Sequence, residues 1–252
     1  MNLGELLEEL RENILNDRSN QVSGPSDYLW SDSTLIRYIN EAQRRFARLG
    51  LVLRDATTPQ CCTVALALNT VNYVLDPSVV AVLSAKYPLD PGDLARAGHA
   101  ALGTYNTPDP YFFNPTYLSN LPPGKVMAWS TDEQVSADDN GSMSVVTMRV
   151  YPAPIDPFAT SLQLRVARLP LDKLCDMEDV PEIPEDHHID MLDWAAYRAL
   201  RVVDHDKGDP ERAAEFKQSF ADHVEEAKKA AQLKMFVPMQ WGFGRNGFTW
   251  ER

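Results

Sequence analysis

Apolar residues recur at helical spacing most regularly in residues 29–50, and this pattern predicts the clearest helix of the chain. Ser31 is a good N-cap, because its hydroxyl can accept a hydrogen bond from a free backbone N–H group of the first turn. Trp30 and Leu35 occupy the two positions of a hydrophobic staple, and Gly50 is expected to end the helix. The apolar side comprises Leu35, Ile36, Ile39, Ala42, Phe46 and Leu49.

The same spacing predicts three further helices, near residues 2–16, 185–203 and 210–235. Asp209 is expected to cap the last one, and Pro210 suits its first turn, where a missing N–H costs nothing. Each helix has one apolar stripe and is not stable alone, so we expect all four to pack together. The stripes are Leu3, Leu6, Leu7, Leu10 and Ile14; Ile189, Leu192, Ala196, Ala199 and Val203; and Ala213, Phe216, Phe220, Val224, Ala227 and Ala231.

Residues 57–170 have a different pattern, in which β-branched apolar runs alternate with turn residues. Asn69 and Thr70 are predicted to form the turn between the first two strands, and a second turn is expected at 138–141. Residues 88–124 are rich in proline, glycine, asparagine and tyrosine, and are predicted to be a long loop with a short helix near 93–102. Strands are predicted at 63–68, 71–75, 79–86, 125–130, 144–151 and 161–169.

This order of elements predicts an α+β fold, in which a β-rich antiparallel insertion separates the second helix from the third. Residues 1–56 and 184–235 are expected to be the two halves of a bundle of about four helices. Residues 57–183 form the predicted insertion, and residues 236–252 an extended C-terminal arm.

The arm is unusually aromatic for a segment rich in glycine. Each aromatic side chain can bury ~150–250 Å², and soluble monomers seldom expose so large an apolar surface. We therefore expect the arm to dock on another protein; the alternative is that it folds back on its own domain. Its aromatic residues are Phe236, Trp241, Phe243, Phe248 and Trp250.

The net charge is −12, since 36 aspartates and glutamates face 24 lysines and arginines. Proteins that grip phosphates are normally basic, so tight nucleic-acid binding through the average surface is not expected. Charge is nevertheless segregated on the first two helices. Phosphate binding and a solvated face are two interpretations; a third is that the basic side of one copy meets the acidic side of the next and closes a ring. The basic residues are Arg37, Arg44, Arg45 and Arg48, and the acidic residues are Glu5, Glu8, Glu9 and Glu12.

No catalytic motif is found, and neither a metal nor another cofactor is expected. The segment 186–190 reads DHHID, and His187 and Asp190 are three residues apart on a predicted helix, as are Asp190 and Asp193. A metal site needs three or four converging ligands, and the sequence contains no second cluster. These residues are therefore expected to be exposed polar groups in the first turns of a helix. The histidines His99, His205 and His223 stand alone in the sequence.

Cysteines and glycines do not indicate a cofactor either. Cys61, Cys62 and Cys175 are expected to be reduced, because adjacent cysteines rarely bridge each other and no zinc spacing is present. A GxGxxG match at 242–247 follows a helix and precedes none, which is the opposite of a dinucleotide-binding context. The acidic N-terminus is not expected to be a signal peptide, and no apolar run approaches the ~20 residues that span a membrane.

Several pieces of the chain, in order, resemble the bacteriophage head-to-tail adaptor (connector) proteins. After an acidic, leucine-rich first helix, residues 30–43 read WSDSTLIRYINEAQ, which is similar to the family's W-S-D-x-x-L-x-x-Y-x-N-E-A-Q pattern. Weaker matches follow in Tyr151-Pro152-Ala153-Pro154, the strand 162–169 ending in Pro170, Ile183-Pro184-Glu185, and Asp193-Trp194-Ala195-Ala196-Tyr197. Residues 88–124 and the arm match no part of the family pattern.

The resemblance implies a structural virion protein without catalytic residues, which forms a ring, often of twelve copies, beneath the portal protein in the neck. In such families the helical bundle and the C-terminal arm grip the portal, and the inserted domain faces the tail nozzle or another tail protein. DNA passes through the middle without specific binding, and an acidic lumen suits that passage because it repels phosphates. Assembly is expected in the host cytoplasm, with no membrane involved.

Three competing interpretations remain. The chain could be another tail-completion or neck protein outside the ring, or a protein-binding module that recruits an unrelated partner through its arm. It could also be an enzyme, for which the cluster at 186–193 is the sole candidate site.

Overall fold

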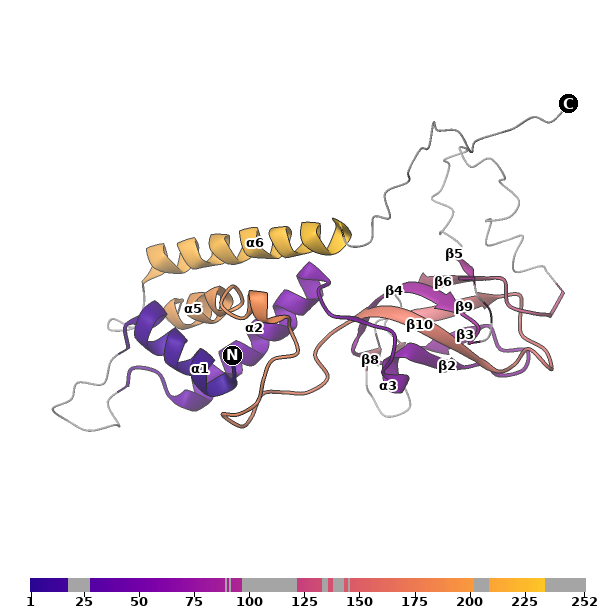
Figure 1. Ribbon diagram of the computed structural model, residues 1–252, viewed down its shortest axis with the longest axis horizontal. Coiled ribbons are helices and arrows are strands. Elements are labelled where there is room, and N and C mark those ends of the chain that lie inside the picture. The colour runs from indigo at the N-terminus through magenta and orange to yellow at the C-terminus, as the bar shows by residue number, and fades with distance from the viewer. Residues whose placement is uncertain are drawn as a thin grey trace, which may run out of the picture.

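The computed structural model describes residues 1–17, 28–88, 90, 92–96, 122–132, 136–137, 143–144, 146–201 and 209–233. Two lobes lie end to end, one made of helices and the other of sheets (Figure 1). The helices come from both ends of the sequence, and the strands come from residues 54–168. This mixture of helices and mainly antiparallel sheets confirms the predicted α+β class.

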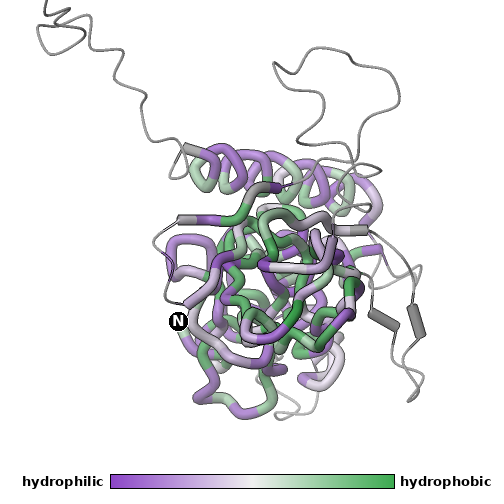
Figure 2. Tube along the Cα trace, turned by 90° about the vertical axis from the view of Figure 1, so that its right-hand side faces the viewer, coloured by the Kyte–Doolittle hydropathy of each residue, from purple (hydrophilic) through white to green (hydrophobic). Residues whose placement is uncertain are grey.

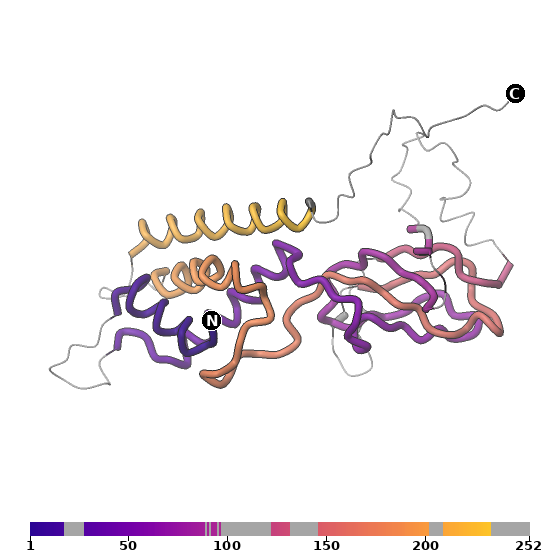
Figure 3. Tube along the Cα trace, in the orientation of Figure 1, coloured from indigo at the N-terminus to yellow at the C-terminus, as the bar shows by residue number. Residues whose placement is uncertain are grey.

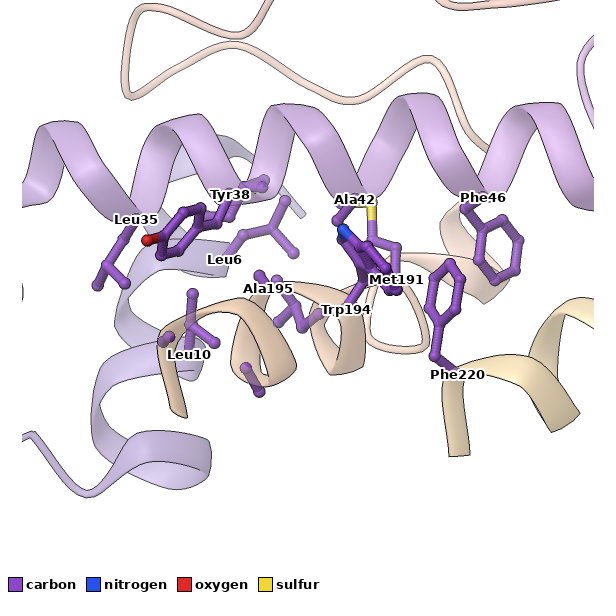
Figure 4. Packing of buried hydrophobic residues seen from close by; sticks show 14 of the residues in the cluster. Leu6, Leu10, Leu35, Tyr38, Ala42, Phe46, Met191, Trp194, Ala195 and Phe220 are labelled. Carbon is purple, nitrogen blue, oxygen red and sulfur yellow. The ribbon is translucent and has the colours of Figure 1, made fainter. Parts of the chain in front are cut away.

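The helical lobe is built around α2 (Asp32–Gly50), which contacts α1 (Leu3–Glu9), α5 (Leu192–Leu200) and α6 (Pro210–Leu233). Its core is aromatic at one end, where Phe46 meets Phe220 with ring centroids 5.9 Å apart. Figure 4 shows how the apolar sides of the four helices converge. The labelled residues are Leu6, Leu10, Leu35, Tyr38, Ala42, Phe46, Met191, Trp194, Ala195 and Phe220.

The first predicted helix is divided. After α1, residues Leu10–Leu15 form the π-helix η1, which ends at Asn16 in the left-handed conformation (φ 54°). A π turn bonds residues five apart, so it brings Leu15 onto the side occupied by Leu10. Leu15 is therefore buried, whereas Ile14, the predicted member of the stripe, is half-buried.

The ends of α2 differ in how well they were predicted. Ser31 is the N-cap, as predicted, and its hydroxyl oxygen accepts a hydrogen bond from the Thr34 N–H at 3.4 Å. Gly50 is not the left-handed residue beyond the helix: it is the last helical residue, and Leu51 takes φ 51°. A Cβ on Gly50 would lie 3.1 Å from Cγ1 of Val52 and 3.7 Å from Cβ of Ala227. Gly50 thus leaves room for the side chain of Val52, whereas 3.7 Å from Ala227 on α6 is an ordinary van der Waals distance.

The third helix starts later than predicted. Residues Glu185–His187 form the short 3₁₀ helix η2, and α5 begins only at Leu192. The tighter 3₁₀ winding shifts which residues face inward. His188 is therefore 2% exposed, and Ile189, predicted to belong to the apolar stripe, is 56% exposed. The start of α6 is confirmed, since the Arg212 N–H donates to the Asp209 carboxylate at 3.1 Å.

The sheet lobe contains two four-stranded sheets whose inner faces share one apolar core. In the first, β10 (Ser161–Arg168) pairs antiparallel with β1 (Arg54–Asp55), β2 (Thr63–Ala65) and β4 (Val79–Lys86). The second has the order β3-β9-β6-β5, and its β5–β6 pair is parallel, a departure from the prediction. Its strands are β3 (Asn72–Val74), β5 (Ala95–Arg96), β6 (Ala128–Asp132) and β9 (Thr147–Tyr151).

Smaller elements complete this lobe. The helix α3 (Pro59–Cys62) precedes β2, and β7 (Ser136–Ala137) pairs with β8 (Met143–Ser144). Seen from the sheet end of the molecule, hydrophobic segments gather toward the middle of the trace and hydrophilic segments lie mostly around its edge (Figure 2). None of the described helices combines the length and the apolar character that crossing a membrane requires.

The first two predicted strands do not pair with each other. The predicted turn is present, with Asn69 at φ 55°, but β2 pairs with β10 and β3 pairs with β9. Leu66 and Tyr73 both enter the core between the sheets, so the chain changes sheet at this turn. Residues 95–96 form β5 instead of the predicted short helix, and most of the predicted loop 88–124 lies outside the described residues.

The chain passes between the lobes twice, after α2 and again after β10 (Figure 3). Arg168 links both passages, because its Nε donates to Asp55 at 2.8 Å and its Nη1 to Glu182 at 2.5 Å. A third link is the hydrogen bond from Arg54 Nη2 to the Ala231 carbonyl oxygen, 2.7 Å long, near the end of α6.

Candidate functional site

The outward side of α2 presents the four predicted arginines, and all four are exposed. The four arginines differ in whether they have a contact within the chain. The Arg45 guanidinium lies 3.9 Å from the centre of the Trp194 ring on α5, a cation–π contact within the chain. Arg37 lies over Tyr38 at 5.5 Å. Arg44 and Arg48 have no hydrogen bond or ion pair among the residues that the structure describes.

The one acid on this side of α2, Glu41, is already used within the chain. Its Oε1 accepts a hydrogen bond from Trp194 Nε1 at 3.2 Å and lies 3.3 Å from Arg198 Nη1. Its neighbour Asn40 donates to the Leu174 carbonyl at 2.8 Å and accepts from the Leu174 N–H at 2.9 Å. Asn40 and Glu41 of the family-like pattern thus fix α2 to the connection after β10 and to α5.

A groove of about 410 Å³ lies where α2 meets the sheet lobe. Arg44 forms one wall, and Asp76 lies in the opposing sheet lobe. Burial alone would raise the pKa of Asp76, but hydrogen bonds from Ser78 and Gln60 lower it below its ordinary value, so this carboxylate stays ionised. The remaining lining residues are Gln60, Pro77, Ser78, Leu169, Pro170 and Leu171.

The four glutamates predicted on the acidic side of the first helix also differ in their contacts. Glu5 forms a capping box with Asn2, in which Asn2 N–H donates to Glu5 Oε2 at 3.0 Å. Glu9 accepts a hydrogen bond from Asn13 Nδ2 at 2.6 Å. Glu8 and Glu12 are exposed, and within the described part of the chain neither has a hydrogen bond or an ion pair.

The predicted acidic and basic residues therefore do not pair with each other within the chain. Among the described residues, no ion pair joins the glutamates of α1 and η1 to the arginines of α2. Of the eight candidate charges, Glu8, Glu12, Arg44 and Arg48 have no hydrogen bond, ion pair or ring contact with the part of the chain that the structure describes. The two glutamates lie on one surface and the two arginines on another.

Sequence reasoning missed a buried arginine beside these surfaces. Arg11 is 6% exposed; its Nη1 donates to Asp17 at 3.0 Å and its Nη2 to the Trp30 carbonyl at 2.8 Å. Arg11 also pairs with Asp32. A signal existed, because Arg11 follows Leu7 by four residues and so continues the leucine stripe. The network ties η1 to the start of α2.

The segment 186–193 and His223 are brought together, contrary to expectation. His187 Nδ1 lies 3.0 Å from Asp190, and His223 Nδ1 lies 3.2 Å from Asp193 and 3.8 Å from Asp190. Burial raises the pKa of the Asp193 carboxyl. These residues are therefore not simply exposed polar groups: they join α6 to the start of α5, a contact that the separation along the sequence concealed.

One group of side chains, Asp55, Cys61 and Cys62, places an oxygen and two sulfurs within 4.8 Å of one another. This set does not fit a metal ion. Asp55 already accepts hydrogen bonds from Thr58 and Arg168. Burial and the neighbouring thiol raise the pKa of Cys62 to about 12, whereas metals bind the thiolate.

The five aromatic residues of the arm, predicted to dock on a partner, lie outside the described residues. They are Phe236, Trp241, Phe243, Phe248 and Trp250.

Comparison with known proteins gives one result that covers both lobes. The family model described as SU10 adaptor protein matches residues 1–241. The match includes Phe236 and Trp241 of the arm and ends before its other three aromatic residues. No curated protein matches the chain.

Proposed function

The chain belongs to the SU10 adaptor protein family, a family of phage head-to-tail adaptors, and from this premise we propose that it forms a ring between the capsid portal and the tail. The observation that carries the proposal is the match over residues 1–241, which takes in every described element of both lobes. In this proposal the protein is a component of the virion neck, and DNA passes through the ring.

The two-lobed shape supports a role between two partners. The bundle of about four helices would face the portal, and the sheet lobe, at the other end of the molecule, would face the tail nozzle or another tail protein (Figure 1). The net charge of −12 favours passage of DNA without specific binding, because a mainly acidic surface repels phosphates.

The C-terminal arm is the proposed portal-docking element. It follows α6, whose last described turn is joined to the sheet lobe by Arg54. Its aromatic residues provide the kind of anchors that dominate protein interfaces.

The proposed role is structural and not catalytic. In support of this, Asp55 pairs with Arg168 between β1 and β10, and His223 lies beside Asp190 and Asp193, so that these side chains hold elements of the fold together.

The test is to mix the full-length chain with the portal protein of the same phage and examine the product by mass measurement and electron microscopy. We expect a closed ring bound to the portal. A variant lacking residues 237–252 should keep its circular dichroism spectrum and its oligomeric mass, and should lose portal binding. A chain that never forms a ring, with or without the portal, would overturn the proposal, and unfolding of the shortened variant would show that the arm belongs to the core.

A further inference from the structure

Unpaired charges on two surfaces of the helical lobe point to the contact between neighbouring copies. Resting on the proposed ring, we infer that Glu8 and Glu12 of one copy pair with Arg44 and Arg48 of the next. The structure thereby reduces eight candidate charges to four, since the others have partners or positions that remove them from the contact.

The exclusions follow from contacts within the chain. Arg45 is stacked on Trp194, Glu5 closes the cap of α1, and Glu9 holds Asn13. Each of these side chains is already positioned by a partner within the chain, and turning toward a neighbouring copy would compete with that interaction. Arg37 lies seven residues before Arg44, about 10 Å away along the helix axis at 1.5 Å per residue, and is placed at the margin of the contact.

The four remaining charges match in number, spacing and exposure. Glu8 and Glu12 are four residues apart in the sequence, across the junction of α1 and η1. Arg44 and Arg48 are also four residues apart, a spacing of about 6 Å in the α-helix α2. All four are exposed. Two ion pairs can therefore form together between the two surfaces. Two pairs fix the position of one surface relative to the other, which a single pair of long side chains would not do.

The geometry favours a contact that continues from copy to copy. Glu8 and Glu12 lie on α1 and η1, whereas Arg44 and Arg48 lie on the outward side of α2, and no ion pair joins the two sets within one chain. A contact between two different surfaces is heterologous, so it repeats head to tail and can close a ring.

Arg44 also places this contact at the junction of the lobes. It is a wall of the groove whose other walls, including Asp76 and Leu169, belong to the sheet lobe or its connection. A neighbouring copy that pairs with Arg44 therefore covers the groove and touches both lobes. Assembly would then restrict the angle between the lobes.

A charge-exchange experiment tests the pairing. The variant Arg44→Glu/Arg48→Glu and the variant Glu8→Arg/Glu12→Arg should each lose the oligomeric mass of the wild type, because like charges would face each other. Mixing the two variants should restore an oligomer of alternating copies, since every contact then has opposite charges. A single chain carrying all four changes should also assemble, whatever the number of copies in the ring.

Matched controls use charges that the structure assigns elsewhere. Arg45→Gln and Glu9→Gln should leave the oligomeric mass unchanged, and circular dichroism should show every variant folded. Masses are measured alone and on the portal, and raising the salt concentration should shift the wild type toward smaller species.

Several outcomes would overturn the inference. If the wild type forms a ring and the charge reversals do not alter it, the contact lies elsewhere and the proposed function stands. Restoration of a dimer alone would show that the surfaces pair reciprocally instead of circularly. Loss of portal or DNA binding without loss of oligomer would assign the arginines to a different partner. Absence of any ring in the wild type would instead refute the proposed function.

Discussion

The helical lobe and the sheet lobe reach stability by different routes. In the helical lobe, α2 and α5 each bury a stripe that repeats every three or four residues, and the two halves of the sequence meet through those stripes. In the sheet lobe, β1 and β2 each pair with β10, a strand about a hundred residues later, and with no other described strand. The comparison shows that the helices at the two ends of the chain are specified by residues a few positions apart. The strands of the insertion depend on partners that are distant in the sequence.

The lobes also differ in what they offer to a partner. The helical lobe presents unpaired arginines and glutamates on two surfaces. Arg54 of the sheet lobe bonds Ala231 of α6, and Arg168 bonds Asp55 in β1 and Glu182 in the connection after β10. Separate cores with a narrow connection allow the two lobes to move relative to each other.

The largest effects should come from removing one core residue in each lobe. Phe46→Ala in the helical lobe and Trp129→Ala in the sheet lobe should each cost about 4 kcal/mol, since both side chains are fully buried. Hydrogen exchange followed by mass spectrometry should show faster exchange mainly in the lobe that carries the change. Equal loss of protection in both lobes would show that they unfold as one unit.

The next effect tests the connection between β10 and β1, close to the point where the chain passes between the lobes. Arg168→Ala leaves the buried carboxylate of Asp55 without its charged partner and should lower the free energy of unfolding by about 3 kcal/mol in urea denaturation. The exposed Arg165 on the same strand is the control, and Arg165→Ala should change stability by less than about 0.5 kcal/mol. Similar results for the two variants would mean that the pairing of Arg168 with Asp55 adds nothing measurable to the stability.

Acid should weaken the same connection. Burial would raise the pKa of Asp55, but hydrogen bonds from Thr58, Thr57 and Arg168 outweigh it and hold the pKa well below its ordinary value. An aspartate in the unfolded chain titrates near pH 4, about its ordinary pKa, so the folded state binds fewer protons below that pH and loses stability as the pH falls. Thermal melts should show a shallower loss below pH 4 for Asp55→Asn than for wild type, with the exposed Asp172→Asn as the control.

The smallest effect concerns one helix end in the helical lobe. Ser31→Ala removes the cap of α2 and should destabilise the protein by about 1 kcal/mol, measured as a lower melting temperature. Ser31→Asp restores an acceptor at the cap and should recover most of that loss. If the alanine variant melts like wild type, the 3.4 Å hydrogen bond contributes nothing measurable.

Sequence reasoning succeeded where a signal was local and failed where a partner was distant. Ser31 and Asp209 were identified as caps because a cap depends on residues three positions away. The hydrogen bond of Glu41 to Trp194 and the pairing of His223 with Asp193 were not foreseen, since each joins different helices. The candidate interface was identified as a set of charges, but the sequence could not separate Arg45 from Arg44.

By itself, the sequence determined the α+β class, the apolar stripes of the helices and the position of the inserted strands, because these follow from periodicity over a few turns. Only the tertiary structure decided that β2 and β3 join different sheets, that a side chain on Gly50 would crowd Val52, and which of the candidate charges have no partner in the described part of the chain. The physical reason is that burial and pairing are properties of two surfaces in contact, and a pattern along one segment describes only one of them.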